Sequence, residues 1–404
     1  MKLNVLFLSL LDFTSLKESN IYTDLLSEFV KNGHHVSIIS PIEKRNNGEE
    51  KIIYESDNCN ILKLKIGNIQ KTNLIEKGIS TITVENKFLR GIKKYYSNIK
   101  FDLVLYSTPP ITFQKVVYYV KKRDNAKSYL LLKDIFPQNA VDLNKFSAKG
   151  PIYQYFRLKE KKLYQDSDYI GTMSEGNSTF LLKHNGFINE DIVEVNPNSI
   201  KIDLPNRIPE SEKEKIRSKY GIDRNKLLLL YGGNLGAPQG INFLLEIIDR
   251  LETENDVSLL IIGSGTEYKN IKQHLNDGNL MNTKLHSYIP KDEYIQIEQC
   301  ADVGLVFLDS RFTIPNIPSR MLGYLQAGLP ILAATDANTD FKNIIVDNEF
   351  GKWSLHGDLD AFFNNIGAIK EQRIQSKMAQ NGITYLKEQC DVASSYKKIM
   401  AHFN

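Results

Sequence analysis

The stretch that decides the fold is the apolar run Leu227–Tyr231 followed by the glycine-rich segment Gly232–Gly240, with the sequence GGNLGAPQG. We call Gly232–Gly240 the glycine loop. It leads into a helical pattern, and such a junction can bind an anion. Glycines let a ligand approach the backbone, and the first N–H groups of the helix point at it. A nucleotide-binding half is therefore expected to begin mid-chain, which leaves the preceding residues for another role.

Apolar segments of strand length alternate with helical patterns on both sides of the glycine loop. Before it, we expect strands at Asn4–Leu10, His35–Ser40, Asn60–Leu64, Asp102–Tyr106, Ser128–Leu132 and Asp168–Thr172, and helices at Tyr22–Lys31, Thr112–Arg123 and Ile152–Tyr164. After it begins, we expect strands at Leu227–Tyr231, Ser258–Ile262, Ala301–Leu308 and Pro330–Ala333. This alternation predicts an α/β fold with parallel sheets covered on both faces. We expect two Rossmann-like, doubly wound domains facing a cleft, with ligands at the carboxyl ends of the strands.

The same pattern predicts four segments. Residues 1–196 form the N-terminal domain, and residues 216–388 form a second domain that contains the glycine loop. Residues 197–215 are rich in proline and charge, as is typical of a linker. Residues 389–404 include the helical pattern Asp391–Phe403, and we expect this helix to pack back on the N-terminal domain.

Composition narrows the class of protein. With 42% hydrophobic and 25% charged residues, the chain has the composition of a typical globular protein. Cys59, Cys300 and Cys390 lack metal or redox spacing, so we expect a reducing cytoplasm. We also expect an enzyme that needs no metal and no cofactor. No uncharged apolar run reaches about 18 residues, so no membrane-spanning helix is expected. A net charge of only +3 without a recognition motif argues against nucleic acid as a partner.

The first half contains a basic region, Lys87–Lys127. Within it, Arg90, Lys93 and Lys94 alternate with apolar and aromatic residues at helical spacing. This pattern is typical of a helix that lies on an anionic membrane surface. It also fits an ordinary amphipathic helix with a solvated basic face.

Several motifs, in order along nearly the whole chain, are similar to those of family-4 glycosyltransferases of the two-domain GT-B class. The general ones are Asn32–Val36, Ile262–Gly265, Ala301–Gly304 and Ala327–Pro330. More specific stretches resemble the WbuB-like transferases of bacterial capsule and O-antigen assembly: Lys133–Asp142, Met173–Asn177, the glycine loop and Asn316–Arg320. That subgroup resembles N-acetyl-L-fucosaminyl transferases. The resemblance implies a UDP-activated deoxy amino sugar as donor and a polyprenyl-diphosphate-linked sugar as acceptor.

The expected donor site follows the motifs. Backbone N–H groups of Gly233, Asn234, Leu235 and Gly236 would face the diphosphate, whose charge grows as the glycosidic bond breaks. A helix N-terminus contributes roughly 0.3–1 kcal/mol at a surface, so a fixed cation is also expected. Further donor contacts are expected from Asn316, Pro318, Ser319 and Arg320, and from Tyr288 and Ile289 near the base.

Two departures from the family affect the expected donor site, and the first of them makes Arg320 the expected cation. Asn234 and Gln239 occupy the positions where the family usually has an Arg and a Lys. Pro315 and Gly323 occupy those of two glutamates, the second of which binds ribose. A guanidinium at Arg320 can bind a diphosphate bidentately. The alternative is an N-cap serine, Ser319, followed by a surface arginine. For Tyr288, the alternative is a core tyrosine at a strand end.

Acceptor contacts are expected from the first half. Asp134 follows the strand Ser128–Leu132 and would take or orient the acceptor hydroxyl proton, while Lys133 would face a phosphate. The alternative for Asp134 is a turn cap before Pro137. Glu18, Ser19 and Asn20, in another strand-end loop, would contact acceptor or sugar hydroxyls.

Together these features predict a cytoplasmic enzyme, peripheral on the inner face of the cell membrane. Its reaction would move a UDP-linked deoxy-N-acetylamino sugar, such as N-acetyl-L-fucosamine, onto a polyprenyl-diphosphate-linked sugar. A UDP-sugar 2-epimerase and a non-catalytic partner in an assembly complex remain alternatives. A nicotinamide dehydrogenase is disfavoured, because no G-x-G-x-x-G follows the first strand.

Overall fold

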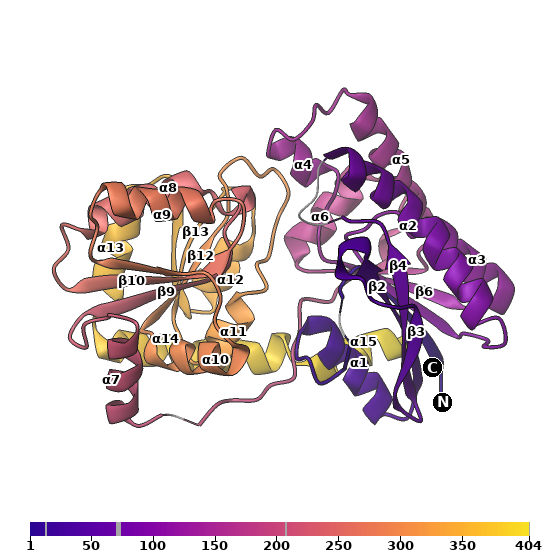
Figure 1. The fold of residues 1–404 in the computed structure, drawn as a ribbon, viewed down its shortest axis with the longest axis horizontal. Helices are drawn as coiled ribbons and strands as arrows, with labels where there is room; N and C mark the ends of the chain where they lie inside the picture. Colours follow the sequence, from indigo (N-terminus) through magenta and orange to yellow (C-terminus); the bar gives the residue numbers. More distant parts are fainter. Residues whose placement is uncertain (13, 70–73, 207, 404) are drawn as a thin grey trace. The chain divides into compact units, whose positions relative to one another are not determined.

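The computed structural model describes residues 1–12, 14–69, 74–206 and 208–403. It divides the chain into two compact units (Figure 1). Unit 1 comprises Met1–Lys201 together with the C-terminal residues from Asp391, and unit 2 comprises Ile202–Cys390. The chain therefore leaves unit 1, builds all of unit 2 and returns to unit 1 with its last helix.

Unit 1 is a sheet with helices on both faces. Its strands, in the order β3-β4-β2-β1-β5-β6-β7-β8, are β1 (Asn4–Leu8), β2 (His35–Glu43), β3 (Lys51–Ser56), β4 (Cys59–Ile66), β5 (Leu103–Ser107), β6 (Lys127–Leu132), β7 (Tyr169–Thr172) and β8 (Val193–Val195). All pairs are parallel except β3 with β4. Its helices are α1 (Ile21–Lys31), α2 (Leu74–Tyr95), α3 (Gln114–Asp124), α4 (Gln138–Asp142), α5 (Pro151–Asp166), α6 (Glu175–His184) and α15 (Val392–Ala401), with 3₁₀ turns at Lys44–Asn46 and Glu190–Ile192.

The last helix, α15, is part of the core of unit 1. Val392 and Ile399 are buried among residues of β1, β2 and α1. Tyr396 packs its ring on Phe29 at 4.9 Å between centroids, and its hydroxyl lies 2.8 Å from His34 Nε2. Residues far apart in sequence thus close one hydrophobic core.

Unit 2 is a six-stranded, fully parallel sheet with helices on both faces. Its order, β11-β10-β9-β12-β13-β14, joins β9 (Leu227–Asn234), β10 (Val257–Ser264), β11 (Thr283–His286), β12 (Val303–Phe307), β13 (Ile331–Thr335) and β14 (Gly351–Leu355). Its helices are α7 (Glu210–Lys219), α8 (Ile241–Leu251), α9 (Tyr268–Asp277), α10 (Lys291–Cys300), α11 (Met321–Gln326), α12 (Phe341–Asp347), α13 (Leu359–Ile369) and α14 (Gln372–Gln389). The chain order reverses between β9 and β12, which is where doubly wound sheets bind ligands.

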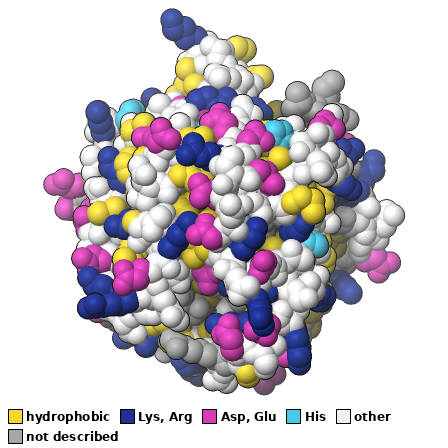
Figure 2. All heavy atoms as spheres, turned by 90° about the vertical axis from the view of Figure 1, so that its left-hand side faces the viewer, with side chains coloured by type: hydrophobic (Ala, Val, Ile, Leu, Met, Phe, Trp, Pro, Cys, Tyr) yellow, Lys and Arg dark blue, Asp and Glu magenta, His cyan; other side chains and the backbone are white. Residues whose placement is uncertain are grey.

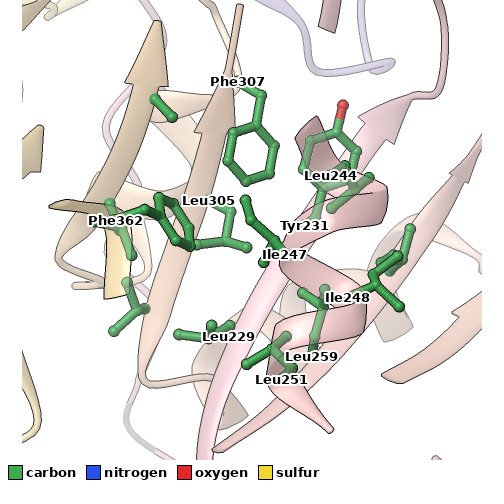
Figure 3. Packing of buried hydrophobic residues seen from close by; sticks show 14 of the residues in the cluster. Leu229, Tyr231, Leu244, Ile247, Ile248, Leu251, Leu259, Leu305, Phe307 and Phe362 are labelled. Carbon is green, nitrogen blue, oxygen red and sulfur yellow. The ribbon is translucent and has the colours of Figure 1, made fainter. Parts of the chain in front are cut away.

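The core of unit 2 holds β9 in place. Leu244, Ile247 and Leu251 recur on one face of α8 and pack on the sheet near Leu229, as expected for an amphipathic helix (Figure 3). At the carboxyl end of β9, the ring of Tyr231 stacks on a neighbouring phenylalanine of β12 at 5.7 Å. The strand end that precedes the glycine loop is therefore rigidly packed.

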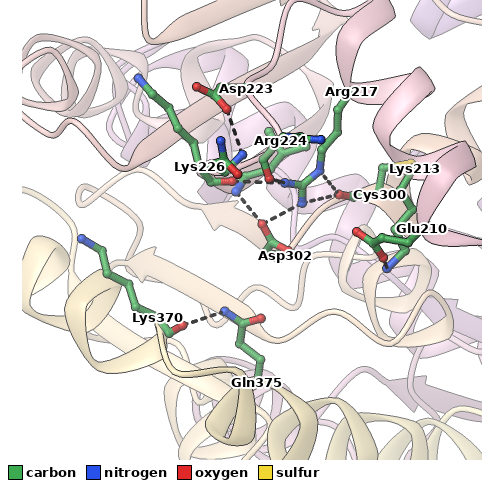
Figure 4. Close-up of polar contacts among 12 residues, drawn as sticks. Glu210, Lys213, Arg217, Asp223, Arg224, Lys226, Cys300, Asp302, Lys370 and Gln375 are labelled. Atoms are coloured by element: carbon green, nitrogen blue, oxygen red, sulfur yellow. Dashed lines mark hydrogen bonds and ion pairs between the residues drawn. The ribbon is translucent and has the colours of Figure 1, made fainter.

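The expected linker 197–215 is wrong at its C-terminal end, because α7 begins at Glu210. The charges that suggested a linker are those of a surface helix, with a pair such as Lys213–Glu210 one turn apart. Arg217 fixes α7 to unit 2 by donating to the Cys300 carbonyl at 2.7 and 2.9 Å and to Asp302 at 2.8 Å (Figure 4).

The described residues contain no helix long and apolar enough to cross a bilayer. Within the same ranges, no group of three or more His, Cys, Asp or Glu side chains is arranged to hold a metal ion. On the face drawn in Figure 2, cationic and anionic side chains intermingle. That face offers no surface of a single charge sign.

Candidate functional site

The glycine loop begins with a strand that continues further than the sequence pattern indicates. β9 runs through Gly232 and Gly233 to Asn234 and pairs with β10 along this length. A 3₁₀ turn, Ala237–Gln239, then leads into α8. The strand does not end at Tyr231 as expected, but the turn still lies at the carboxyl edge of the sheet.

At least two of the four expected amide donors are already used inside unit 2, and Gly233 also lies in the ladder between β9 and β10. The Leu235 N–H donates to the Ser264 carbonyl at 2.9 Å, and the Leu235 carbonyl accepts from Glu267 at 3.0 Å. The Gly236 N–H donates to Gln239 Oε1 at 3.2 Å. The expectation for Leu235 and Gly236 therefore differs from the structure, because the loop needs both amides to hold its own shape.

The two side chains that stand where the family has cations bind each other. Asn234 Nδ2 donates to Gln239 Oε1 at 2.9 Å, and the same oxygen accepts the Gly236 N–H. These amides close the turn and carry no charge. Any cation at the loop must come from another segment.

Arg320 is that cation within unit 2. Its guanidinium carbon lies 4.4 Å from the centroid of the Tyr231 ring. A Cβ placed on Gly233 would lie 3.4 Å from Arg320 Nη2, and Gly233 has a φ of 125°. Glycine suits this position for two reasons: the backbone conformation is one that other residues rarely adopt, and the guanidinium packed beside it leaves little room for a side chain.

The arginine is not the surface side chain of the alternative interpretation. Arg320 occupies the N-cap position of α11 and no side chain caps this helix, although Ser319 was a candidate cap. Ser319 is exposed. Arg320 Nη1 is buried without a hydrogen-bond partner in the part of the chain that the structure describes. A buried guanidinium nitrogen without an acceptor suits an anionic ligand, because an unpaired buried donor is costly.

Three side chains that the sequence did not single out lie near the glycine loop or near α11: Tyr294, Glu298 and Tyr324. The Gly232 N–H donates to Tyr324 Oη at 2.9 Å, and that hydroxyl donates to the Leu230 carbonyl at 3.2 Å. Burial raises the pKa of Glu298 to about 8. The i, i+4 spacing of Tyr294 and Glu298 on one helix was the signal that could have paired them.

The segment Asn316–Ser319 is held by the loop after β13. Thr339 Oγ1 donates to the Asn316 carbonyl at 2.8 Å. Asp336 Oδ1 accepts the N–H groups of Asn338 and Thr339 at 2.8 and 2.9 Å. Asn316 and Pro318 are half-buried, so backbone and side-chain atoms there remain candidates for donor contact.

The segment after β11 presents Tyr288 to solvent. Its side chain is 81% exposed, so the core alternative is wrong. Ile289 is half-buried. Contact of these two residues with a base stays a prediction.

In unit 1, Asp134 is half-buried at the carboxyl end of β6. Asn139 Nδ2 donates to both carboxylate oxygens at 2.8 Å, and Thr108 Oγ1 donates to the Asp134 carbonyl at 2.8 Å. Burial raises the pKa of Asp134 to about 6, while the Asn139 hydrogen bond opposes the shift. A carboxyl that titrates near neutrality can exchange a proton with a hydroxyl.

The remaining expected acceptor residues have local partners. Lys133 Nζ donates to the Asn196 carbonyl at 3.1 Å. Asn20 is the N-cap of α1, where its Oδ1 accepts from two backbone N–H groups, so helix capping accounts for its side chain. Glu18 Oε1 accepts the Thr14 N–H at 2.8 Å, and the Ser19 side chain is exposed. A contact of Glu18 or Ser19 with a ligand stays a prediction.

Helix α2 separates its apolar and basic residues. Phe88 and Ile92 are buried in unit 1, while Arg90, Lys93 and Lys94 are exposed. Phe88 therefore belongs to the core of unit 1 and not to the surface that carries the cations.

Unit 2 contains a segment that is similar to a known protein family. Residues 212–387 match the family described as glycosyl transferases group 1. The chain is 22% identical over 293 residues to the probable glycosyltransferase WbjE of Pseudomonas aeruginosa, covering 71% of this chain and 70% of that protein. It is 22% identical over 191 residues to the putative colanic acid biosynthesis glycosyl transferase WcaI of Escherichia coli K12, covering 47% and 46%.

Solved structures share the whole architecture. A sucrose-phosphate synthase from Thermosynechococcus elongatus has a TM-score of 0.78 at 16% identity, covering 100% of this chain and 98% of that one. The Anabaena protein HepE in complex with UDP and glucose has a TM-score of 0.70 at 13% identity, covering 99% of both chains. At these identities the likeness shows the fold. The expected α/β architecture of two Rossmann-like domains, the GT-B class, is confirmed.

Proposed function

We propose that the chain is a glycosyltransferase that binds a UDP-sugar in unit 2, with the diphosphate between the glycine loop and Arg320. The observation that carries the proposal is the guanidinium of Arg320, packed on Tyr231 and Gly233 with a buried Nη1 that lacks a partner among the described residues. It lies at the carboxyl edge of a doubly wound sheet, in the segment that matches group 1 glycosyl transferases.

Arg320 gives this site a physical role in catalysis. The leaving UDP diphosphate gains negative charge as the bond to the sugar breaks. A preorganised cation in a site shielded from water binds that charge more strongly in the transition state than in the ground state. Asn234 is the proposed backbone contact, with Gly233 packed beside Arg320, because Leu235 and Gly236 use their N–H groups within unit 2.

The sugar and the acceptor are proposed from relatives and from the resemblance of the motifs. HepE is described in complex with UDP, which supports a uridine nucleotide. The name of WcaI refers to colanic acid biosynthesis, which supports a role in polysaccharide assembly. The finer proposal is a UDP-linked deoxy-N-acetylamino sugar, with N-acetyl-L-fucosamine as first candidate, and a polyprenyl-diphosphate-linked sugar as acceptor in capsule or O-antigen synthesis.

Unit 1 is proposed to bind the acceptor. Asp134 would receive or orient the proton of the acceptor hydroxyl, since its pKa of about 6 leaves it mostly ionised at neutral pH. The exposed cations Arg90, Lys93 and Lys94 would bind anionic headgroups on the inner face of the cell membrane, where a lipid-linked acceptor resides.

The test is incubation of the full chain with radiolabelled UDP-sugars and a polyprenyl-diphosphate-linked sugar. A labelled lipid-linked disaccharide supports the proposal. An epimerised UDP-sugar without transfer identifies a 2-epimerase instead. No product and no UDP binding with any donor tried would leave a non-catalytic partner as the better description and overturn the proposal.

A further inference from the structure

Helix α10 brings two side chains to the glycine loop and α11 that the proposed function does not use. Tyr294 and Glu298 are four residues apart and so lie on one face of α10. A Cβ on Gly232 would lie 1.7 Å from the Tyr294 hydroxyl oxygen, and a Cβ on Gly323 would lie 2.8 Å from Glu298 Oε1. Both polar groups occupy space that only a glycine leaves open.

These groups form one buried polar network. Tyr324 Oη accepts the Gly232 N–H at 2.9 Å and is next to the Tyr294 hydroxyl, which in turn interacts with Glu298. Glu298 is 7% exposed. The network therefore leads from the Glu298 carboxyl on α10, through the hydroxyls of Tyr294 and Tyr324, to the backbone of the glycine loop.

Arg320 lies close enough to the same two tyrosines to interact with them electrostatically. It precedes α11, and the tyrosines that it influences electrostatically include Tyr294 and Tyr324. Glu298 influences the same two tyrosines. Arg320, which is proposed to bind the diphosphate, and the buried carboxyl of Glu298 therefore interact with the same two tyrosines.

The protonation state of Glu298 follows from its surroundings. Burial raises its pKa to about 8, while Lys291 and the Tyr294 hydroxyl on α10 oppose the shift. The helix α7 also packs against α10, but its Lys219 and Tyr220 donate hydrogen bonds to Glu293 rather than to Glu298. Near pH 7 the carboxyl is mostly neutral, so it can donate a proton to a hydrogen bond without offsetting the charge of Arg320.

We propose that Glu298 is a positioning residue for the diphosphate of a nucleoside-diphosphate donor. Through Tyr294 and Tyr324 it holds the glycine loop and Arg320 as one preorganised anion site, and it leaves the guanidinium charge uncompensated. This inference rests on the proposed function and deepens it.

The experiment is calorimetric titration of the full chain with UDP from about pH 6.5 to about pH 9. We compare the wild type with Glu298→Gln, which keeps the shape of the neutral carboxyl and cannot ionise. The ratio of the wild-type Kd to the Glu298→Gln Kd should rise about fivefold across this range, because only the wild type acquires a negative charge behind Arg320. Comparing the two proteins cancels titration of UDP itself.

Glu293→Gln on the same helix is the matched control. Its carboxylate pairs with Lys219, and that pairing lowers its pKa, so its ratio to the wild type should stay constant with pH. Tyr294→Phe keeps the ring and removes the hydroxyl. It should weaken UDP binding about fivefold near neutral pH, with a melting temperature close to that of the wild type.

A constant Kd ratio for Glu298→Gln, or full affinity in Tyr294→Phe, overturns the inference. The proposed function fails separately. It does so if the wild type binds no UDP at any pH, or if Arg320→Ala binds UDP as tightly as the wild type. Loss of binding in Arg320→Ala together with a constant Glu298→Gln ratio rejects only the role of Glu298.

Discussion

Arg320 holds its charge in a site that offers it no acidic partner among the described residues, although other arginines of the chain pair with carboxylates. We predict that Arg320→Ala weakens UDP binding about 30- to 100-fold, because a charge-assisted bidentate contact is lost. Arg320→Lys should lose about tenfold, since a lysine keeps the charge but not the planar fork. Calorimetric titration with UDP measures both.

The matched control is Arg250→Ala on α8, whose guanidinium also lies over an aromatic ring, 5.4 Å from the centroid of Phe363. Its affinity for UDP should equal that of the wild type. An equal loss in both variants would show that removing any arginine stacked on a ring is enough, which contradicts a specific diphosphate contact.

Gly233→Ala tests the close approach of the loop to Arg320. The residue would have to keep a φ of 125°, and its Cβ would lie 3.4 Å from Nη2. We predict a loss of about 1–2 kcal/mol in the free energy of unfolding and a UDP affinity lowered about tenfold.

Gly357→Ala is the control, because Gly357 has a φ of 97° and nothing within 4 Å of the added Cβ. It should show a similar loss of stability without the loss of affinity. Urea unfolding and UDP titration separate the two effects. If both variants bind UDP equally well, the contact with Arg320 does not matter for the ligand.

The raised pKa of Asp134 predicts that the reaction rate and the stability of the fold change with pH in opposite directions. Its folded-state pKa of about 6 lies above the usual 3.8, so the fold favours the protonated form. The stability from this group is fully present below about pH 4 and is lost as the pH rises through about 6. As a proton acceptor it should make kcat/KM rise over the same upper range.

Asp134→Asn should therefore gain stability relative to the wild type when urea unfolding is measured at about pH 7.5 rather than about pH 4. It should also lose the acidic limb of the rate profile, with much of the activity. A stability difference that does not change with pH would mean that the carboxyl titrates normally and would contradict the proposed base.

For single residues, the sequence predicted the position of the candidate site more accurately than it predicted which atoms form that site. It placed Arg320 and the glycine loop together, and the structure brings them into contact. It missed that Leu235 uses its N–H internally and that Asn20 caps a helix. Side-chain type is visible in a sequence, but the partner that consumes a hydrogen bond is set by folding.

Among the elements, α2 carries apolar residues and basic residues on different faces. Its apolar face is covered by the core of unit 1, and its exposed face carries Arg90, Lys93 and Lys94. We predict that changing these three to Glu releases the protein from vesicles containing anionic lipid, because each cation near the surface contributes about 1 kcal/mol. Co-sedimentation at low and high salt measures the effect.

The control reverses three cations of unit 2, Lys213, Lys215 and Arg224, to Glu, for the same change in net charge. That variant should still co-sediment. Equal release of both variants would mean that net charge, rather than the surface of α2, governs binding. Unchanged co-sedimentation of the α2 variant would refute a docking helix.

The elements that sequence reasoning missed are mainly those without a continuous apolar run. β3 is an antiparallel edge strand with alternating exposed residues, and the helix α7 has no buried residue. Buried parallel strands such as β1 and β10 appear in sequence as uninterrupted apolar segments, which is why they were predicted closely.

For the whole molecule, the return of α15 to unit 1 has a testable consequence. Deleting the residues after Cys390 removes Val392 and Ile399 from the core of unit 1 and Tyr396 from His34. We predict that calorimetry shows a lower melting transition for unit 1, by several kcal/mol of unfolding free energy, while the transition of unit 2 does not move.

Tyr396→Phe is the milder companion. It keeps the ring packed on Phe29 and loses only the hydrogen bond to His34, so it should lower stability by about 1 kcal/mol. Two unmoved transitions after the deletion would contradict the role of α15 as part of the core.

The sequence correctly predicted the two Rossmann-like domains, and it also predicted the glycine loop as an anion site with Arg320 as its cation. Strand and helix periodicity, and the need of a diphosphate for positive charge, are local or chemical constraints that a linear chain expresses directly. Folding sets three features that the sequence did not reveal: the amides that the loop uses internally, the contact between Asn234 and Gln239, and the position of Glu298 at Gly323. These depend on contacts between segments far apart in the chain, and on burial, which changes the charge of Glu298 without any change in its residue type.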